Sequence, residues 1–353
     1  MADYTTIDNP TKHFNTVLYT GNGSTAHAIT GVGFQPDWVW CKARSITKDH
    51  LLFDINRGVT NALKTNSNGA VDTNSEFLQA FGTDGFTVGN QGKINTSSAT
   101  YVSWNWLGAN GTASDSNGSI TSTVSVNQTA GLSIVTYTGN GSGATTVGHG
   151  LGSVPKMIII KVRNTTNEWV VYHTSLGATK FIEMNSTGAV QTNSTRFNDT
   201  EPTSSVFSLG SAAGVNANGN THVAYCFAEK QGYSKFGKWT GTGQSSGPFI
   251  YTGFRPAFLF WKMSSSTENW YIIDNKRMPA NDVRNYPDFM PVLYPNLNNA
   301  DGFLNDEIDL LANGFKINGT NSAHNTDGAT YIYWAVAEHP FVTAGTKAAG
   351  PAR

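Results

Sequence analysis

One block of sequence occurs three times along the chain, and this repetition constrains the fold more than any other feature. Each copy begins with an aromatic residue followed by Thr-Gly-x-Gly, at 19–23, 137–141 and 239–243. A proline then opens an apolar run that ends in lysine, at 36–42, 155–161 and 256–262. A fixed long period makes the chain an array of one module, and such arrays usually present surfaces.

Each copy closes on an aromatic run, at 101–106, 222–227 and 331–336. Six residues before these runs stand Asn95, Asn216 and Asn325. Between these landmarks, short β-branched and aromatic runs alternate with Asn-Gly, Asp-Gly and Thr-Gly turns, which is typical of hairpins. Only 305–312 has a pattern that predicts a turn or two of helix.

In the first copy we expect strands at 16–19, 28–31, 38–43, 51–55, 61–65, 76–81, 86–88 and 101–106. Eight short strands in roughly 90 residues predict a double sheet. The sequence therefore predicts an all-β chain of three tandem β-sandwich modules that are jelly-roll-like. The expected divisions are an N-terminal segment 1–16, repeat 1 at 17–110, a linker with an edge strand at 111–131, repeat 2 at 132–230, repeat 3 at 231–341 and a flexible tail 342–353.

Alternation along the strands predicts their faces. In the closing strands we expect Val102, Trp104 and Trp106 to point into the core, with a mixed, half-exposed face opposite. The proline-to-lysine strands differ, because both of their faces are apolar. We expect the second face, which holds Val39 and Cys41 in repeat 1, to pack on a neighbouring repeat, a loop layer or another subunit.

Composition excludes several classes of function. Charged residues make up 13% of the chain, about half the usual share, and the formal net charge is −1, which gives no electrostatic footprint for nucleic acid or membrane. Cys41 and Cys226 lie in apolar strands and are predicted to be buried free thiols. The sequence shows neither a secretory signal nor an apolar run long enough to cross a membrane. With so few charges, solubility must come from Asn, Thr, Ser and Gly, and such surfaces are typical of extracellular β-proteins and virion proteins. Together with the lack of a visible export signal, this suits a virion protein made in a host cytoplasm.

No catalytic, cofactor-binding or metal-ligating motif is recognisable, so we predict a protein that is not an enzyme and needs no cofactor. Nucleophile elbows and zinc-ligand spacings are missing from the sequence. A pair of carboxylates for glycoside cleavage needs only spatial proximity. The acids that could supply such a pair are Asp54, Asp274, Asp306, Glu307 and Asp309.

Two sets of residues recur at fixed offsets from the repeat lysines. Asp54, His173 and Asp274 stand twelve residues after them and would meet only if the modules shared an axis; a solvent-facing strand end is the alternative. Trp169 and Trp270 stand eight residues after the lysine, where repeat 1 has His50. These two tryptophans could stack on sugar rings at the surface or pack in the core.

Several motifs together resemble a known family. They are Tyr-Thr-Gly-Asn-Gly at 137–141, the glycine-rich run into the apolar strand at 148–161, the segment 168–180, the closing strand 224–229, the third apolar strand 253–262 and the closing stretch 331–341. In combination they resemble repeat-built proteins of marine and other tailed bacteriophages, described as uncharacterised or tail-fibre-like virion proteins. The resemblance runs from about Tyr4 to Phe341 and implies a structural part of a phage particle.

The expected function is a tail-fibre or receptor-binding component that mediates host attachment. The alternative is a capsid decoration or head-fibre protein packed on the major capsid lattice, and a polysaccharide depolymerase is a third class. Expected partners are other virion proteins, a host surface glycan or protein, and further copies of the chain in an oligomer such as a trimer.

Overall fold

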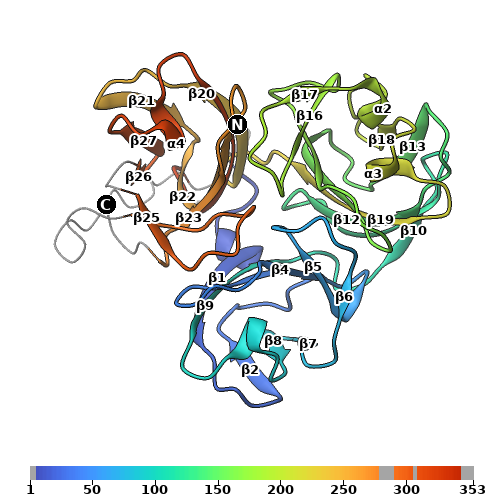
Figure 1. Ribbon diagram of the computed structural model, residues 1–353, viewed down its shortest axis with the longest axis horizontal. Coiled ribbons are helices and arrows are strands. Elements are labelled where there is room, and N and C mark those ends of the chain that lie inside the picture. The colour runs from blue at the N-terminus through green and yellow to red at the C-terminus, as the bar shows by residue number, and fades with distance from the viewer. Residues whose placement is uncertain (1–4, 278–289, 305–307, 343–353) are drawn as a thin grey trace.

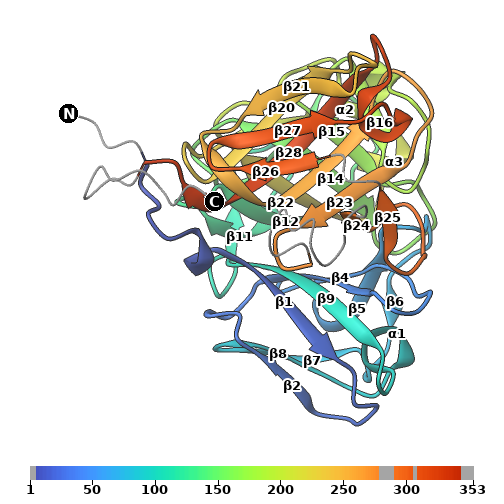
Figure 2. The ribbon, with the colours of Figure 1, turned by 90° about the vertical axis from the view of Figure 1, so that its left-hand side faces the viewer.

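The computed structural model describes residues 5–277, 290–304 and 308–342, which fold almost entirely into strands. Figure 1 shows three sandwich-type modules arranged around one axis, each filling about a third of the view. Figure 2 shows from the side that the first module, in blue and cyan, lies against the other two. The expectation of an all-β chain of sandwich-type modules is confirmed.

The first module has a large sheet and a small one. The large sheet has the order β1 (Phe14–Thr20), β9 (Thr100–Trp106), β3 (Trp38–Ala43), β4 (Leu51–Asp54), β5 (Gly58–Lys64) and β6 (Asp72–Thr73). The small sheet has the order β2 (His27–Thr30), β8 (Gly85–Val88) and β7 (Leu78–Gly82). Two short helices, η1 (Pro10–Lys12) and α1 (Gly92–Asn95), complete the module.

The second module extends its large sheet with two strands from the segment 111–131. The order is β10 (Ala113–Asp115), β11 (Ser122–Asn127), β12 (Leu132–Thr138), β19 (Thr221–Ala228), β14 (Pro155–Val162), β15 (Val170–His173), β16 (Lys180–Glu183) and β17 (Gln191–Thr192). The small sheet pairs β13 (Thr145–Gly148) with β18 (Val206–Leu209). Its helices are α2 (Ser194–Phe197) and α3 (Ala213–Asn216).

The third module repeats the plan. Its large sheet has the order β20 (Ser234–Thr240), β28 (Thr330–Pro340), β22 (Phe254–Met263) and β23 (Trp270–Asp274). The small sheet has the order β21 (Ser246–Tyr251), β27 (Gly314–Asn318) and β26 (Ile308–Leu311), and β24 (Met290–Val292) pairs with β25 (Gly302–Leu304). The short helix is α4 (Ser322–Asn325). The helix expected at 305–312 is wrong for 308–311, which is strand, while Asp306 and Glu307 lie outside the described residues.

The register of strand pairing is the same in the three modules. Trp38 pairs with Trp106 across β3 and β9, Met157 with Phe227 across β14 and β19, and Phe258 with Val336 across β22 and β28. The same three residues pair on their other side with Asp54, His173 and Asp274. The sequence repeat is therefore also a repeat of backbone pairing.

A single aromatic core joins the modules along the axis. One cluster of buried residues combines Trp38 and Trp104 of the first module with Tyr225 of the second and Trp334 of the third. The Trp38 ring stacks on Tyr225 with centroids 4.7 Å apart, and the Trp106 ring stacks on Trp334 at 5.4 Å. The three modules thus cover each other's apolar sheet faces.

The expected assignment is wrong for two of the faces. The face of Val39 and Cys41, expected to contact a neighbour, packs with Leu51 and Phe53 in the first module's own sandwich. The face of Trp38 lines the shared core together with Val102, Trp104 and Trp106 of the closing strand, which were expected to point into a core. The opposite face of the closing strand is also buried rather than half-exposed. Both faces are apolar because each has a different partner layer.

A buried asparagine fixes the turn at the start of each module. The Asn95 Oδ1 accepts a hydrogen bond from the backbone N–H of Asn22, and its Nδ2 donates to the carbonyl oxygens of Ser24 and Gly89. Asn216 and Asn325 make the corresponding bonds in their own modules. A Cβ on Gly21 would lie 2.2 Å from the Thr96 carbonyl oxygen, so only glycine fits this turn.

We expect Trp38→Ala to destabilise the whole chain, because the indole is fully buried in the shared core. The loss should be about 3–5 kcal/mol in the free energy of unfolding. Denaturant titration followed by tryptophan fluorescence and circular dichroism measures it, with Leu18→Ala, at a position 40% exposed, as the control. Unfolding that separates into independent module transitions would contradict a common core.

Candidate functional site

Backbone hydrogen bonds close the three modules into a ring around the axis. The Val71 N–H donates to the Arg163 carbonyl oxygen at 2.8 Å, which links the first module to the second. The Val190 N–H donates to the Ser264 carbonyl oxygen at 2.9 Å, which links the second module to the third. The Asp301 N–H donates to the Arg44 carbonyl oxygen at 2.7 Å, which links the third module to the first. Since the third contact returns to the first module, each module docks on the next in one direction.

The residues at the twelfth position after each lysine do lie at module boundaries, but they do not meet each other. The Asp54 carboxylate accepts a hydrogen bond from the Tyr225 hydroxyl at 2.7 Å, and the Asp274 carboxylate accepts one from the Trp104 indole at 3.1 Å. His173 Nε2 lies 3.0 Å from the Tyr333 carbonyl oxygen. Each therefore contacts the closing strand of the next module and is not solvent-facing.

Asp54 and Asp274 are each neutralised by a buried arginine three residues later. The Arg57 Nε lies 2.5 Å from Asp54, and the Arg277 Nε lies 2.7 Å from Asp274. All four of these side chains are fully buried. Because both carboxylates are committed to structural contacts, they are unsuited to acid–base chemistry on a substrate.

Of the two roles considered for Trp169 and Trp270, the structure places both side chains in the core and not at a sugar-binding surface. Both indoles are 0% exposed. The Trp169 Nε1 donates to the Lys64 carbonyl oxygen at 2.9 Å, and the Trp270 Nε1 donates to the Glu183 carbonyl oxygen at 2.9 Å. Each indole is thus buried against the preceding module and hydrogen-bonded to its backbone, so these tryptophans serve in core packing.

A second set of equivalent asparagines bonds to the backbone of these two tryptophans and of His50, their counterpart in the first module. Asn66, Asn185 and Asn296 accept hydrogen bonds from the backbone N–H groups of His50, Trp169 and Trp270, at 3.0, 2.8 and 2.9 Å. Their Nδ2 groups donate to the preceding side chains, Asp49, Glu168 and Asn269.

This second asparagine set was missed in the sequence, although it left a signal. Asn66 and Asn185 each stand 24 residues after the repeat lysine, within the related stretches Asn-Ser-Asn-Gly and Asn-Ser-Thr-Gly. Asn296 stands 34 residues after Lys262, so a fixed offset fails in the third module.

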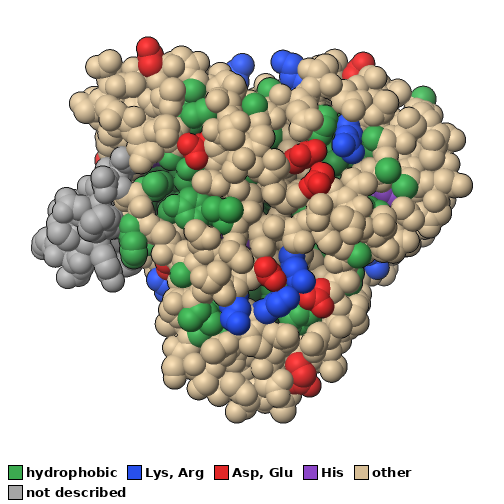
Figure 3. Space-filling model, in the orientation of Figure 1, with side chains coloured by type: hydrophobic (Ala, Val, Ile, Leu, Met, Phe, Trp, Pro, Cys, Tyr) green, Lys and Arg blue, Asp and Glu red, His purple; other side chains and the backbone are tan. Residues whose placement is uncertain are grey.

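The loops that carry these asparagines surround a polar hollow at one end of the axis, which we call the axial hollow. Its volume is about 570 Å³. It is lined by Asn66, Ser67, Asn68, Glu168, Glu183, Asn185, Ser186, Thr187, Asn296 and Leu297. All three modules contribute, and Figure 3 shows charged side chains gathered near the middle of the face seen along the axis.

Two carboxylates give the axial hollow its charge. The Glu168 carboxylate accepts hydrogen bonds from Asn68 Nδ2 at 3.2 Å and from Asn185 Nδ2. Burial and the nearby Glu168 raise the pKa of Glu183, while the Arg196 guanidinium opposes this shift. Within the described residues neither carboxylate forms an ion pair.

The repeat lysines are buried near the C-terminal ends of β3, β14 and β22. Burial lowers the pKa of Lys42, Lys161 and Lys262 to about 8. The Lys161 ammonium donates to the carbonyl oxygens of Val162 at 2.9 Å and Asn68 at 3.1 Å. It therefore ties the second module to a loop of the first and uses backbone oxygens rather than a carboxylate.

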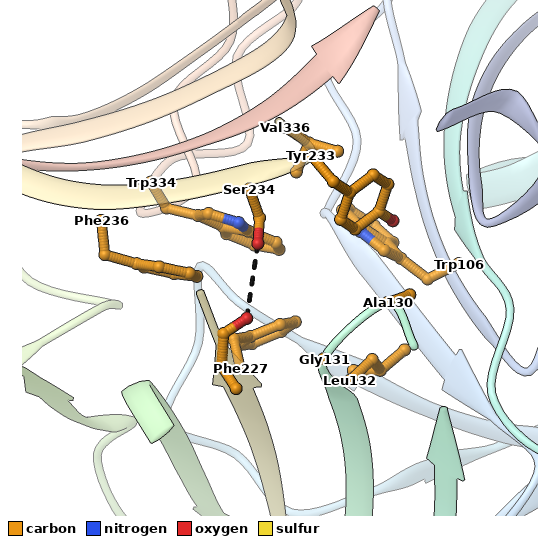
Figure 4. Close-up of a pocket in the computed structure, with 11 residues that line it drawn as sticks. Trp106, Ala130, Gly131, Leu132, Phe227, Tyr233, Ser234, Phe236, Trp334 and Val336 are labelled. Carbon is orange, nitrogen blue, oxygen red and sulfur yellow. Dashed lines mark hydrogen bonds between the residues drawn. The ribbon is translucent and has the colours of Figure 1, made fainter. Parts of the chain in front are cut away.

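A small apolar void lies elsewhere in the shared core. Figure 4 shows the rings of Trp106, Phe227, Phe236 and Trp334 around it. The Ser234 hydroxyl donates a hydrogen bond to the Ala228 carbonyl oxygen at 3.3 Å. Its volume is about 10 Å³, near the minimum for one water molecule, and its lining is apolar. It is a packing defect with no room for a ligand.

The described part of the chain offers no group of three or more His, Cys, Asp or Glu residues that could hold a metal ion. Asp309, another candidate acid, accepts a hydrogen bond from Asn318 Nδ2 at 2.9 Å. Both cysteines are buried and free, as expected. No helix in residues 5–277, 290–304 and 308–342 has the length and apolarity to cross a membrane.

Fold and site define an all-β protein of three equivalent modules closed around an axis, with a polar hollow at one end. Residues 9–340 match the family described as "Domain of unknown function (DUF7483)", and the chain belongs to this family. Neither the curated proteins nor the solved structures contain a match.

Removing the charge of Asp54 should be costly, because Arg57 would then be a buried cation without its partner. We expect Asp54→Asn to lower the free energy of unfolding by about 3–5 kcal/mol. Chemical denaturation measures the change. Asp327→Asn, which neutralises an exposed acid, serves as the matched control. A loss below about 1 kcal/mol would show that the pair is not needed.

Buried histidines should make the fold sensitive to mild acid. Burial lowers the pKa of His173 and His222 to about 4, below the value of about 6.5 in an unfolded chain. Between these values the unfolded chain binds more protons, so stability is fully present above about pH 6.5 and falls toward pH 4. We expect the thermal midpoint to drop from pH 7 to pH 5, and less so in His173→Gln. Equal drops would contradict this assignment.

Proposed function

We propose that the chain is a non-enzymatic structural protein of a bacteriophage particle, a tail-fibre or receptor-binding component that mediates host attachment. The observation that supports this best is the closed ring of modules, in which the polar candidates for chemistry at the boundaries are committed to structural contacts. A rigid body of this kind suits presentation of a surface. Its sequence resemblance to tail-fibre-like proteins points the same way.

The face that carries the axial hollow is the proposed attachment surface. It is the region where loops of all three modules come together around solvent-accessible polar groups. The proposed partners are a host surface glycan or protein at this end and other virion proteins elsewhere. The apolar faces that suggested a homo-oligomer are covered within one chain, so we propose no self-association through them.

Purified virions of a phage that encodes the chain test this proposal. We expect mass spectrometry to find the protein at tens of copies per particle, as for a tail part. Hundreds of copies would instead favour a capsid decoration protein. Absence from the particle would refute a virion role.

The recombinant chain should also bind host cells and slow phage adsorption in a competition assay. Failure in both measurements would refute host attachment. Release of reducing ends from host polysaccharide would overturn the assignment as a non-enzyme and favour a depolymerase.

A further inference from the structure

The size and lining of the axial hollow fit a small polar ligand. A volume of about 570 Å³ lies within the range of roughly 300–1,000 Å³ that is usual for small-molecule sites. Among the described lining residues Leu297 is the one apolar side chain, and the others carry amides, hydroxyls or carboxylates. An apolar ligand would leave these groups without hydrogen-bond partners, which disfavours it.

Many lining groups keep hydrogen-bonding capacity after their structural contacts are counted. The Ser67 and Ser186 hydroxyl oxygens accept bonds from the backbone N–H groups of Gly69 and Gly188, at 3.1 and 3.0 Å, and each hydroxyl can still donate. An ionised carboxylate can accept about four hydrogen bonds. Glu168 receives two from asparagine side chains, so it has room for more.

The charge of the axial hollow selects among polar ligands. Glu168 and Glu183 line the same hollow, and their charges interact. The Arg196 guanidinium attracts both carboxylates and the Lys161 ammonium attracts Glu168. Within the described residues, however, neither cation forms an ion pair with them. Lys161 is bonded to backbone carbonyl oxygens, and the Arg196 guanidinium lies 4.8 Å above the centre of the Phe181 ring. A ligand with a positive group would therefore relieve the repulsion between the two carboxylates and form charge-assisted hydrogen bonds.

We propose that the axial hollow binds an oligosaccharide that contains amino sugars, with an ammonium group at Glu168 and Glu183 and ring hydroxyls on the serine, threonine and asparagine side chains. This inference rests on the attachment role proposed above, and it names the chemical class of the glycan. It also makes binding sensitive to salt, because the selecting interaction is between charges at an open site.

The test is calorimetric titration of the full chain with the glucosamine trimer chitotriose, compared with its fully N-acetylated form, which lacks the charge. We expect chitotriose to bind at least about tenfold more tightly, the equivalent of one charge-assisted contact. Equal affinities for the two trimers, or no binding of chitotriose, would overturn the proposal.

Glu183→Gln is the decisive variant, because it removes the charge with little change in size. The Trp270 indole donates to the backbone oxygen of Glu183, so the substitution preserves this hydrogen bond between modules. We expect chitotriose affinity to fall about tenfold, while Asp327→Asn, which removes an exposed acid outside the lining, leaves it unchanged. Equal affinities of Glu183→Gln and the parent chain would refute the assignment.

The outcomes separate this inference from the attachment role. A chain that is present in virions and slows adsorption but does not bind chitotriose would keep the attachment role and lose the amino-sugar site. If the chain binds chitotriose through Glu183 but is absent from virions, the amino-sugar site is supported and the attachment role is refuted.

Discussion

The need to cover a second apolar face on each large sheet governs this structure. A two-layer sandwich buries only one face of a sheet, and here Trp38 and its equivalents lie on the face that the small sheet does not cover. Burial of aromatic side chains of this size contributes strongly to stability. Placing three such faces around one axis satisfies all of them at once. The modules are for this reason parts of one body, although each also has its own sandwich core.

The shared core buries polar groups of the closing strands, and the three boundaries supply different hydrogen-bond partners for them. Asp54 with Arg57 and Asp274 with Arg277 supply buried ion pairs at two of them. The boundary between the second and third modules has His173 instead, and among the described residues the Trp334 indole N–H there finds no hydrogen-bond partner. The strand pairing is thus the same in the three modules, whereas the side chains at the boundaries differ. The ring of modules closes in spite of these differences.

Much of the fold could be predicted from the sequence, because alternation and turn residues act locally. The strand expected at 38–43 matches β3, and the all-β class follows from such runs. The assignment of faces failed because both sides of β3 are equally apolar, and only the packing of three modules decides which side is shared. Trp169 and Trp270 were ambiguous for the same reason. The axial hollow depends on loops from all three modules, which no local pattern brings together.

The axial hollow also shows what a single chain can do that a trimer of identical modules could not. Two residues before Asn66, Asn185 and Asn296 stand Lys64, Glu183 and Tyr294, which are equivalent in the ring. In a homotrimer one residue type would occupy all three positions, and three glutamates facing one axis would repel each other. Linking the modules in one chain lets these positions differ. A site on a threefold axis can then hold two carboxylates on one side and recognise a ligand that is not itself threefold symmetric.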